Sequence, residues 1–143
     1  MNNKIVQRIA TKAVVTRSDG KFVLLREANT YEEGTNIGRW NMPGGRLDIG
    51  ENFESGLKRE LFEETGLKVE IIKPLYVGEW RPIIKGVQNQ IVGILFLCES
   101  KPGNIVLSQD HDAYKWVSAK EALELDIMEP EDIVIKKYDE VKK

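Results

Sequence analysis

The stretch NFESGLKRELFEETG, which starts at Asn52, constrains the fold more than any other segment because it specifies a helix from both ends. Asn52 is a suitable N-cap and Gly66 a suitable C′ residue, so the pattern predicts a helix over residues 53–65. Apolar residues recur every four positions along it: Phe53, Leu57 and Leu61. The segment is therefore expected to pack this stripe into a core.

Three glutamates, Glu60, Glu63 and Glu64, lie beside that stripe in the last turns of the helix. Like charges at these spacings cost roughly 0.2–0.5 kcal/mol per pair, and the dipole at a helix C-terminus favours cations. A divalent cation would reverse both penalties, because oxygen-rich sites suit Mg²⁺ or Mn²⁺. The alternative is a solvated helix face in which Arg59 pairs with Glu63 at i,i+4.

The spacing around these glutamates decides between the two interpretations. Gly45 is followed by five residues and Glu51, then by seven residues and RELFEETGL, which ends at Leu67. This resembles the Nudix box, G-x5-E-x7-R-E-U-x-E-E-x-G-U with U aliphatic, and departs from it nowhere. A chance match has a probability on the order of one in 10⁹ per starting position. The flanks WNMPGG and SQDHDAYKWVSAKEAL also look like those of the family, so the resemblance covers residues 5 to about 125.

The resemblance implies an α/β fold, the α/β/α Nudix sandwich with a mixed β-sheet, in a single domain over residues 1–143. It also implies Mg²⁺-dependent hydrolysis of a nucleoside diphosphate linked to another moiety, with Mn²⁺ as a substitute. A (d)NTP or modified nucleotide, giving a monophosphate and pyrophosphate, is the expected substrate. ADP-ribose or a nucleotide sugar is the alternative, since Pro82 stands about fifteen residues past the box. A non-catalytic nucleotide-binding module would have lost box glutamates, and none is lost.

Site residues follow from the resemblance position by position. The family's metal-binding and base-assisting glutamates match Glu60, Glu63 and Glu64, and its first box acid, sometimes a further metal ligand, matches Glu51. Arg59 matches the arginine that orients the glutamates. The glycine pair before the box often supplies a backbone carbonyl to the metal, which makes Gly44 the candidate.

Many family members add one acid six residues before a tryptophan. Trp116 points back in this way to Asp110, where glutamate is more usual. Asp110 is thus a candidate ligand or base, and a solvated turn residue is the alternative. His111, the only histidine, lies beside it and has an apt ordinary pKa for a general base, although a lone loop histidine more often has a structural role.

Substrate contacts are suggested by residue type. Arg26 and Arg81 are candidate phosphate partners, with ordinary surface charges as the alternative. Trp40, Tyr31 and Trp80 are candidates for stacking a base, but Trp40 also fits a packing role beside the glycine-rich segment.

The rest of the chain predicts strands and helices in alternation. The predicted strands are 5–17 and 21–27, joined in a hairpin, then 69–82 and 87–100, the last central in the sheet. Residues 28–40 read as a long loop, and residues 41–52 as a segment rich in backbone breakers. Ser118 and Glu121 form a capping box, and a last helix follows Pro130.

Composition and charge restrict the kinds of partner that this chain could bind. The formal net charge is −2, from 21 Lys and Arg against 23 Asp and Glu, and the dispersed cations leave no basic footprint for a long nucleic acid. The single Cys98 fits a reducing, cytoplasmic setting as a buried apolar residue. No apolar run is long enough to cross a membrane. The partner that the resemblance implies is a small nucleotide-type substrate. Family members are often dimers, which leaves a homodimer open.

Overall fold

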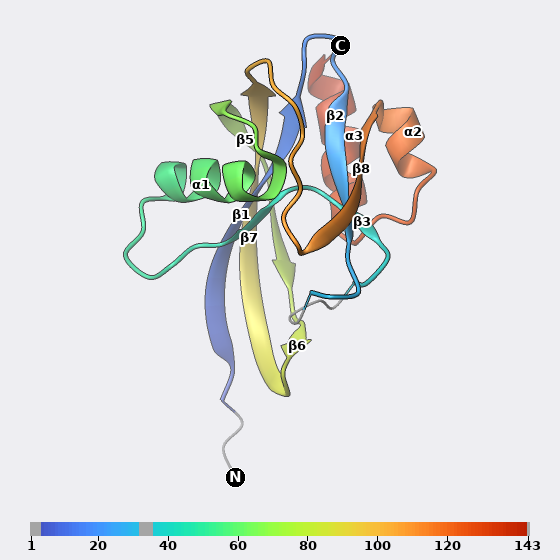
Figure 1. Ribbon diagram of the computed structural model, residues 1–143. Helices are drawn as coiled ribbons and strands as arrows, with labels where there is room; N and C mark the ends of the chain where they lie inside the picture. Colours follow the sequence, from blue (N-terminus) through green and yellow to red (C-terminus); the bar gives the residue numbers. More distant parts are fainter. Residues whose placement is uncertain (1–3, 32–35, 143) are drawn as a thin grey trace.

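The computed structural model describes residues 4–31 and 36–142 (Figure 1). In chain order the elements are β1 (Val6–Thr16), β2 (Phe22–Glu27), β3 (Trp40–Asn41), β4 (Gly44–Arg46), α1 (Phe53–Thr65), β5 (Val69–Trp80), β6 (Ile83–Ile84), β7 (Val87–Ser100), β8 (His111–Val117), α2 (Ala119–Leu123) and α3 (Glu131–Lys142).

The sheet is covered on both faces, because alternate residues of its strands enter two separate cores. Under α2 and α3 lies a cluster that includes Val14, Phe22, Leu24, Leu95, Val134 and Ile135. Under α1 lies a second cluster that includes Ala13, Val15, Val23, Leu25, Leu57, Leu61 and Phe96. Side chains alternate between the faces of a strand, so β1, β2 and β7 contribute to both clusters. The expected α/β/α sandwich is therefore confirmed, with α1 on one side and α2 and α3 on the other in Figure 1.

The sheet is mixed, as expected. Its main path runs β3-β2-β1-β7-β5, and β4, β6 and β8 pair with β1, β7 and β2. β1 and β7 pair in parallel over their whole common length, from Val6 opposite Asn89 to Thr16 opposite Glu99, while the other strand pairs are antiparallel. The central position predicted for residues 87–100 is confirmed. The predicted hairpin of β1 and β2 pairs only at Thr16 and Phe22, because β1 turns away to pair with β4.

The box helix has the predicted ends. The Asn52 side chain accepts hydrogen bonds from the backbone N–H groups of Glu54 and Ser55, and Gly66 closes the helix with a φ of 74°. Leu57 and Leu61 are fully buried. The prediction was wrong for Phe53, which is 42% exposed and stacks on Phe96 with 5.7 Å between ring centroids. Because Phe53 is the first helical residue, its ring lies at the rim of the core rather than within it.

Short strands interrupt the segments predicted to be irregular. Trp40 lies in β3, which pairs with β2, and Gly44 begins β4, which pairs with β1. Residues 32–35 of the predicted loop lie outside the described residues. β8 was not predicted from the sequence; its burial does not alternate strictly, and it is a strand because it pairs with β2.

The C-terminal part folds as predicted from its caps. Ser118 and Glu121 form the reciprocal capping box of α2, and α3 follows Pro130. Across the described residues, no helix is both long and apolar enough to cross a membrane.

Candidate functional site

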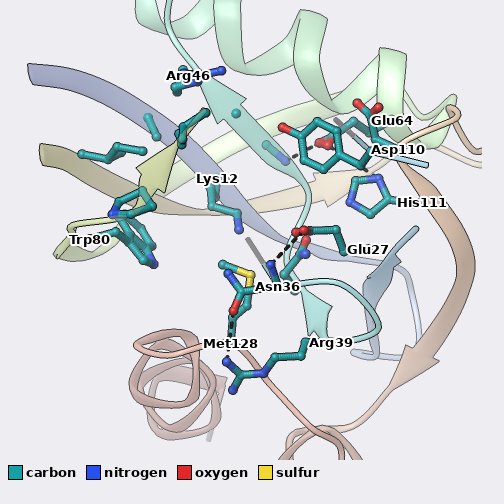
Figure 2. Close-up of a pocket in the computed structure, with 18 of the residues that line it drawn as sticks. Lys12, Glu27, Asn36, Arg39, Arg46, Glu64, Trp80, Asp110, His111 and Met128 are labelled. Carbon is teal, nitrogen blue, oxygen red and sulfur yellow. Dashed lines mark hydrogen bonds and ion pairs between the residues drawn. The ribbon is translucent and has the colours of Figure 1, made fainter. Parts of the chain in front are cut away.

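A pocket of about 570 Å³ opens where the split between β1 and β2 meets the glycine-rich strand β4 (Figure 2). Its polar end is lined by Gly44, Gly45, Glu64, Asp110 and His111. Its apolar end is lined by Ala10, Trp80, Pro82, Ile84, Ile91 and Met128. Four cationic side chains also line it: Lys12, Arg39, Arg46 and Arg81. The pocket thus combines acidic, basic and apolar surfaces, which suits a phosphorylated organic molecule.

Glu64 connects α1 to the glycine-rich strand. Its carboxylate accepts a hydrogen bond of 2.8 Å from the backbone N–H of Gly44, and its side chain is almost entirely buried. Burial raises the pKa of Glu64 to about 8, and the hydrogen bond from Gly44 only partly opposes this shift. Gly44 has a φ of 138°, and a Cβ there would overlap the Thr11 carbonyl oxygen, so glycine is required.

Glu60 approaches the next residue of the same strand. A Cβ on Gly45 would lie 2.8 Å from the Glu60 Oε2, so glycine lets this carboxylate reach the strand. Burial raises the pKa of Glu60, and the neighbouring Arg59 partly offsets that rise. Two carboxylates therefore meet the Gly44–Gly45 backbone in a partly desolvated environment.

Arg59 forms hydrogen bonds with three carboxylates of the box. Its guanidinium donates to Glu51 at 2.8 and 3.0 Å, to Glu60 at 3.2 Å and to both carboxylate oxygens of Glu63 at 3.2 Å. The predicted i,i+4 pair of Arg59 and Glu63 is thus present. These hydrogen bonds lower the pKa of Glu51 and raise that of Arg59. The orienting contact is strongest toward Glu51, whose carboxylate is bound in a bidentate manner.

The box acids do not by themselves converge into a full set of metal ligands. Within residues 4–31 and 36–142, no three Asp, Glu, His or Cys side chains converge closely enough to hold a metal ion. The chemistry of the donors nevertheless fits a hard divalent cation, because Glu60 and Glu64 bring carboxylate oxygens to the same strand. A cation there would also offset the burial of the Glu64 charge. Glu63 is exposed and can change rotamer to join them.

Asp110 and His111 approach Glu64 from the other side of the pocket. Asp110 contributes its charge to the raised pKa of Glu64, and its backbone carbonyl accepts from Ala28 N–H. The His111 Nδ1 lies 4.0 Å from the Glu64 Oε2 and has no hydrogen-bond partner among the described residues. Burial lowers the pKa of His111 to about 4, so this contact is not an ion pair at neutral pH.

The predicted substrate contacts separate into two groups. Arg81 lines the pocket, although it also pairs with Glu79 at 2.7 Å. Arg26 and Trp40 do not line it. Arg26 pairs with Asp112 at 2.7 Å, and the Trp40 ring is buried.

Lys12 is a pocket residue that the sequence analysis missed. Its Nζ lies 2.5 Å from the Oε2 of Glu131, which is fully buried, and the other oxygen of Glu131 accepts from the backbone N–H of Met42. Burial raises the pKa of Glu131, and Lys12 opposes that rise. The available signal was a lysine inside the apolar strand sequence IATKAVV, since a charge on a central strand requires a partner or a ligand.

Comparison with known proteins gives concordant results. The model of the NUDIX domain matches residues 6–138. A MutT-like protein of Streptomyces ambofaciens is 32% identical over 116 residues, which cover 81% of this chain and 67% of that protein. Phosphatase NudJ of Escherichia coli K12 is 28% identical over 120 residues, covering 80% and 71%. The crystal structure of a MutT protein from Methanosarcina mazei Go1 shares the fold, with a TM-score of 0.85, 98% of both chains covered and 24% identity.

Proposed function

This chain belongs to the Nudix family of pyrophosphohydrolases, and we propose that it hydrolyses the diphosphate bridge of a small nucleotide-type substrate with Mg²⁺ as cofactor. The preferred substrate is a (d)NTP or modified nucleotide, which would yield a monophosphate and pyrophosphate. The observation that carries the proposal is the buried Glu64 carboxylate, held on Gly44 beside Glu60 at the polar end of the pocket.

The acids have distinct roles in this proposal. Glu60, Glu63 and Glu64, with the Gly44 carbonyl, would hold the metal, and Glu51 would act through Arg59 or as an outer ligand. A bound Mg²⁺ polarises a phosphoryl oxygen and lowers the pKa of its bound water. In the metal-free protein Arg59 positions the carboxylates and offsets their mutual repulsion, because its guanidinium contacts Glu51, Glu60 and Glu63.

The cations of the pocket wall would bind the phosphates. Lys12 is fixed by Glu131 and projects into the middle of the pocket in Figure 2. Arg81 lines the same pocket and can exchange its exposed partner Glu79 for a phosphate. Positive charge held close to the scissile bridge stabilises the charge that develops on the phosphoryl oxygens.

The attacking water needs a proton acceptor, and four carboxylates line the pocket: Glu27, Glu64, Asp110 and Glu129. Glu64 and Asp110 face the same space, and each could take the proton from the attacking water. Comparing the pH–rate profiles of Glu64→Gln and Asp110→Asn at saturating Mg²⁺ would assign the base, because ligand titration is then suppressed and loss of the base removes the acidic limb of the profile.

A release assay tests the proposal. The chain would be incubated with (d)NTPs, 8-oxo-dGTP, ADP-ribose, dinucleoside polyphosphates and sugar nucleotides, with Mg²⁺, Mn²⁺ or EDTA, and the products would be separated. We expect metal-dependent cleavage of a diphosphate bridge that is lost in Glu64→Gln. Absence of cleavage for every substrate with either metal would leave a non-catalytic nucleotide-binding module instead.

Pro82 favours a second substrate class. This residue lines the apolar end of the pocket, at the position where proline is associated with ADP-ribose hydrolases. Release of two monophosphates, with no pyrophosphate, would identify an ADP-ribose or nucleotide-sugar substrate.

A further inference from the structure

Trp80, at the end of β5, is held in one orientation by contacts on two sides. Its indole lies against the backbone of Gly93 in β7, where a Cβ would overlap the ring atom Cζ3. Its Nε1–H donates to the carbonyl oxygen of Glu129 at 3.0 Å. The indole is therefore held by a hydrogen bond at its N–H and by close packing against the Gly93 backbone.

Apolar side chains surround Trp80 in the pocket. Ala10 of β1 is the parallel neighbour of Gly93, and Ala10 lines the pocket with Trp80. Ile91 and Met128 line the same end. An aromatic face beside the apolar side chains of Ala10, Ile91 and Met128 suits a flat aromatic ring.

Trp80 differs in this respect from the other two tryptophans. Trp40 is buried, with the cations of Arg26 and Lys115 near its ring. Trp116 is covered by the Arg17 guanidinium, 4.8 Å from its centroid. Within the part of the chain that the structure describes, Trp80 is the tryptophan that lines the pocket.

The position of Trp80 relative to the acids is equally informative. Figure 2 shows Trp80 and Glu64 on opposite sides of the pocket, with Lys12 between them. A nucleotide has a matching order of chemical groups, with a planar base at one end, the sugar next, and the phosphates with the scissile bridge at the other end.

We propose that Trp80 is the stacking platform for the nucleobase of the substrate. This inference rests on the proposed function, since it takes the phosphates to lie toward Glu64. The base stacks on the indole between Ile91 and Met128, the phosphates meet Lys12, and the bridge reaches the carboxylates. The site selects a planar aromatic ring, because stacking uses the π-face that every base has.

Binding without turnover tests this assignment. Kd values for AMP, GMP, CMP and UMP would be measured in EDTA, by quenching of tryptophan fluorescence and by calorimetry. Ribose 5-phosphate would be the probe that lacks a base. We expect quenching by the nucleotides, and binding at least about tenfold tighter than that of ribose 5-phosphate. Equal affinities for the nucleotides and ribose 5-phosphate would overturn the proposal.

Variants separate stacking from simple packing. Trp80→Leu should weaken nucleotide binding roughly 5- to 100-fold by calorimetry, while Trp80→Phe should restore it to within about threefold. Trp80→Leu should leave the affinity for ribose 5-phosphate unchanged and raise KM for the cleaved substrate more than it lowers kcat. Trp116→Phe, outside the pocket, is the matched control. Wild-type nucleotide affinity in Trp80→Leu would refute the platform.

A second variant covers the case in which Trp80→Leu fails to fold. Gly93→Ala keeps the tryptophan but forces the indole to tilt, and it should also weaken nucleotide binding. Unchanged affinity in a folded Gly93→Ala protein would contradict the fixed platform. These measurements require no metal and no cleavage, so their failure is distinguishable from failure of the hydrolase assay.

Discussion

The Glu64 carboxylate and the backbone N–H of Gly44 are joined by a hydrogen bond of 2.8 Å that links α1 to β4. This contact places a buried acid, with a pKa raised to about 8, beside the Gly44 carbonyl that we propose as a metal ligand. Without a cation, the folded protein therefore favours the protonated form of Glu64 at neutral pH.

Glu64→Gln should abolish activity without harming the fold. Glutamine is isosteric with the protonated acid and can still accept from Gly44 N–H, so Tm at pH 7 should be unchanged or slightly higher. The loss of a charged ligand should lower kcat by several orders of magnitude. Steady-state assays and thermal melts test this, with the exposed Glu54→Gln on the same helix as control. Near-wild-type turnover would remove Glu64 from the site.

The free energy of unfolding should depend on pH through the ionisation of Glu64. Its carboxyl binds a proton more tightly in the folded state, with a pKa of about 8, than in the unfolded chain at about 4.5. Its contribution to stability is therefore fully present below pH 4.5 and is lost as pH rises through 8. Urea denaturation at pH 6 and pH 9 should show a fall that is absent in Glu64→Gln.

Mg²⁺ should counteract the loss of folding stability at high pH. Binding requires the ionised carboxylate, so Mg²⁺ should raise Tm more at pH 8.5 than at pH 6.5 and should release protons at pH 7. Calorimetry in buffers of different ionisation enthalpy measures the released protons. A Tm increase of the same size at both pH values would exclude Glu64 as a ligand.

Arg59→Met should destabilise the metal-free protein more than the metal-bound one. The guanidinium screens Glu51, Glu60 and Glu63 from one another, and its loss leaves their charges unopposed. Saturating Mg²⁺ should restore most of the lost Tm. Arg17→Met, which removes an exposed pair with Asp19, is the control and should show no recovery by metal. Equal losses of Tm with and without metal would argue against the screening role.

Gly45→Ala should reduce activity more than stability. The added Cβ would meet the flexible end of the Glu60 side chain at 2.8 Å, so the carboxylate can move aside while the backbone stays in place. A displaced metal ligand should lower kcat about 10²-fold. Gly103→Ala, whose nearest contact would be 3.5 Å, should match the wild type in both assays. A folded Gly45→Ala enzyme with full activity would show that Glu60 need not approach the strand.

Glu131→Gln should destabilise the protein by about 3–5 kcal/mol, because it leaves the Lys12 ammonium without its buried partner. The double variant Lys12→Met/Glu131→Gln removes both charges and keeps an acceptor for Met42 N–H, so much of the loss should be recovered. Urea unfolding of the four proteins in this cycle gives the coupling energy, and additive losses would contradict a paired role.

The sequence predicted those features that depend on neighbours along the chain. Asn52 and Gly66 define the ends of α1 through local hydrogen bonds and a left-handed backbone, and Leu57 and Leu61 define its buried side by periodicity. The box spacing placed Arg59 within reach of Glu63, because residues four apart on a helix are adjacent. The family, the sandwich architecture and the cluster of acidic residues therefore follow from the order of residues alone.

Only the tertiary structure decided which of those acids is buried and what faces it. Glu60, Glu63 and Glu64 look alike in the sequence, but Glu64 alone of the three is almost fully buried, because β4 and β8 close over it. Lys12 and Glu131 lie 119 residues apart and meet through the stacking of α3 on the sheet. Burial and pKa are determined by segments distant in the chain, and no local pattern specifies them.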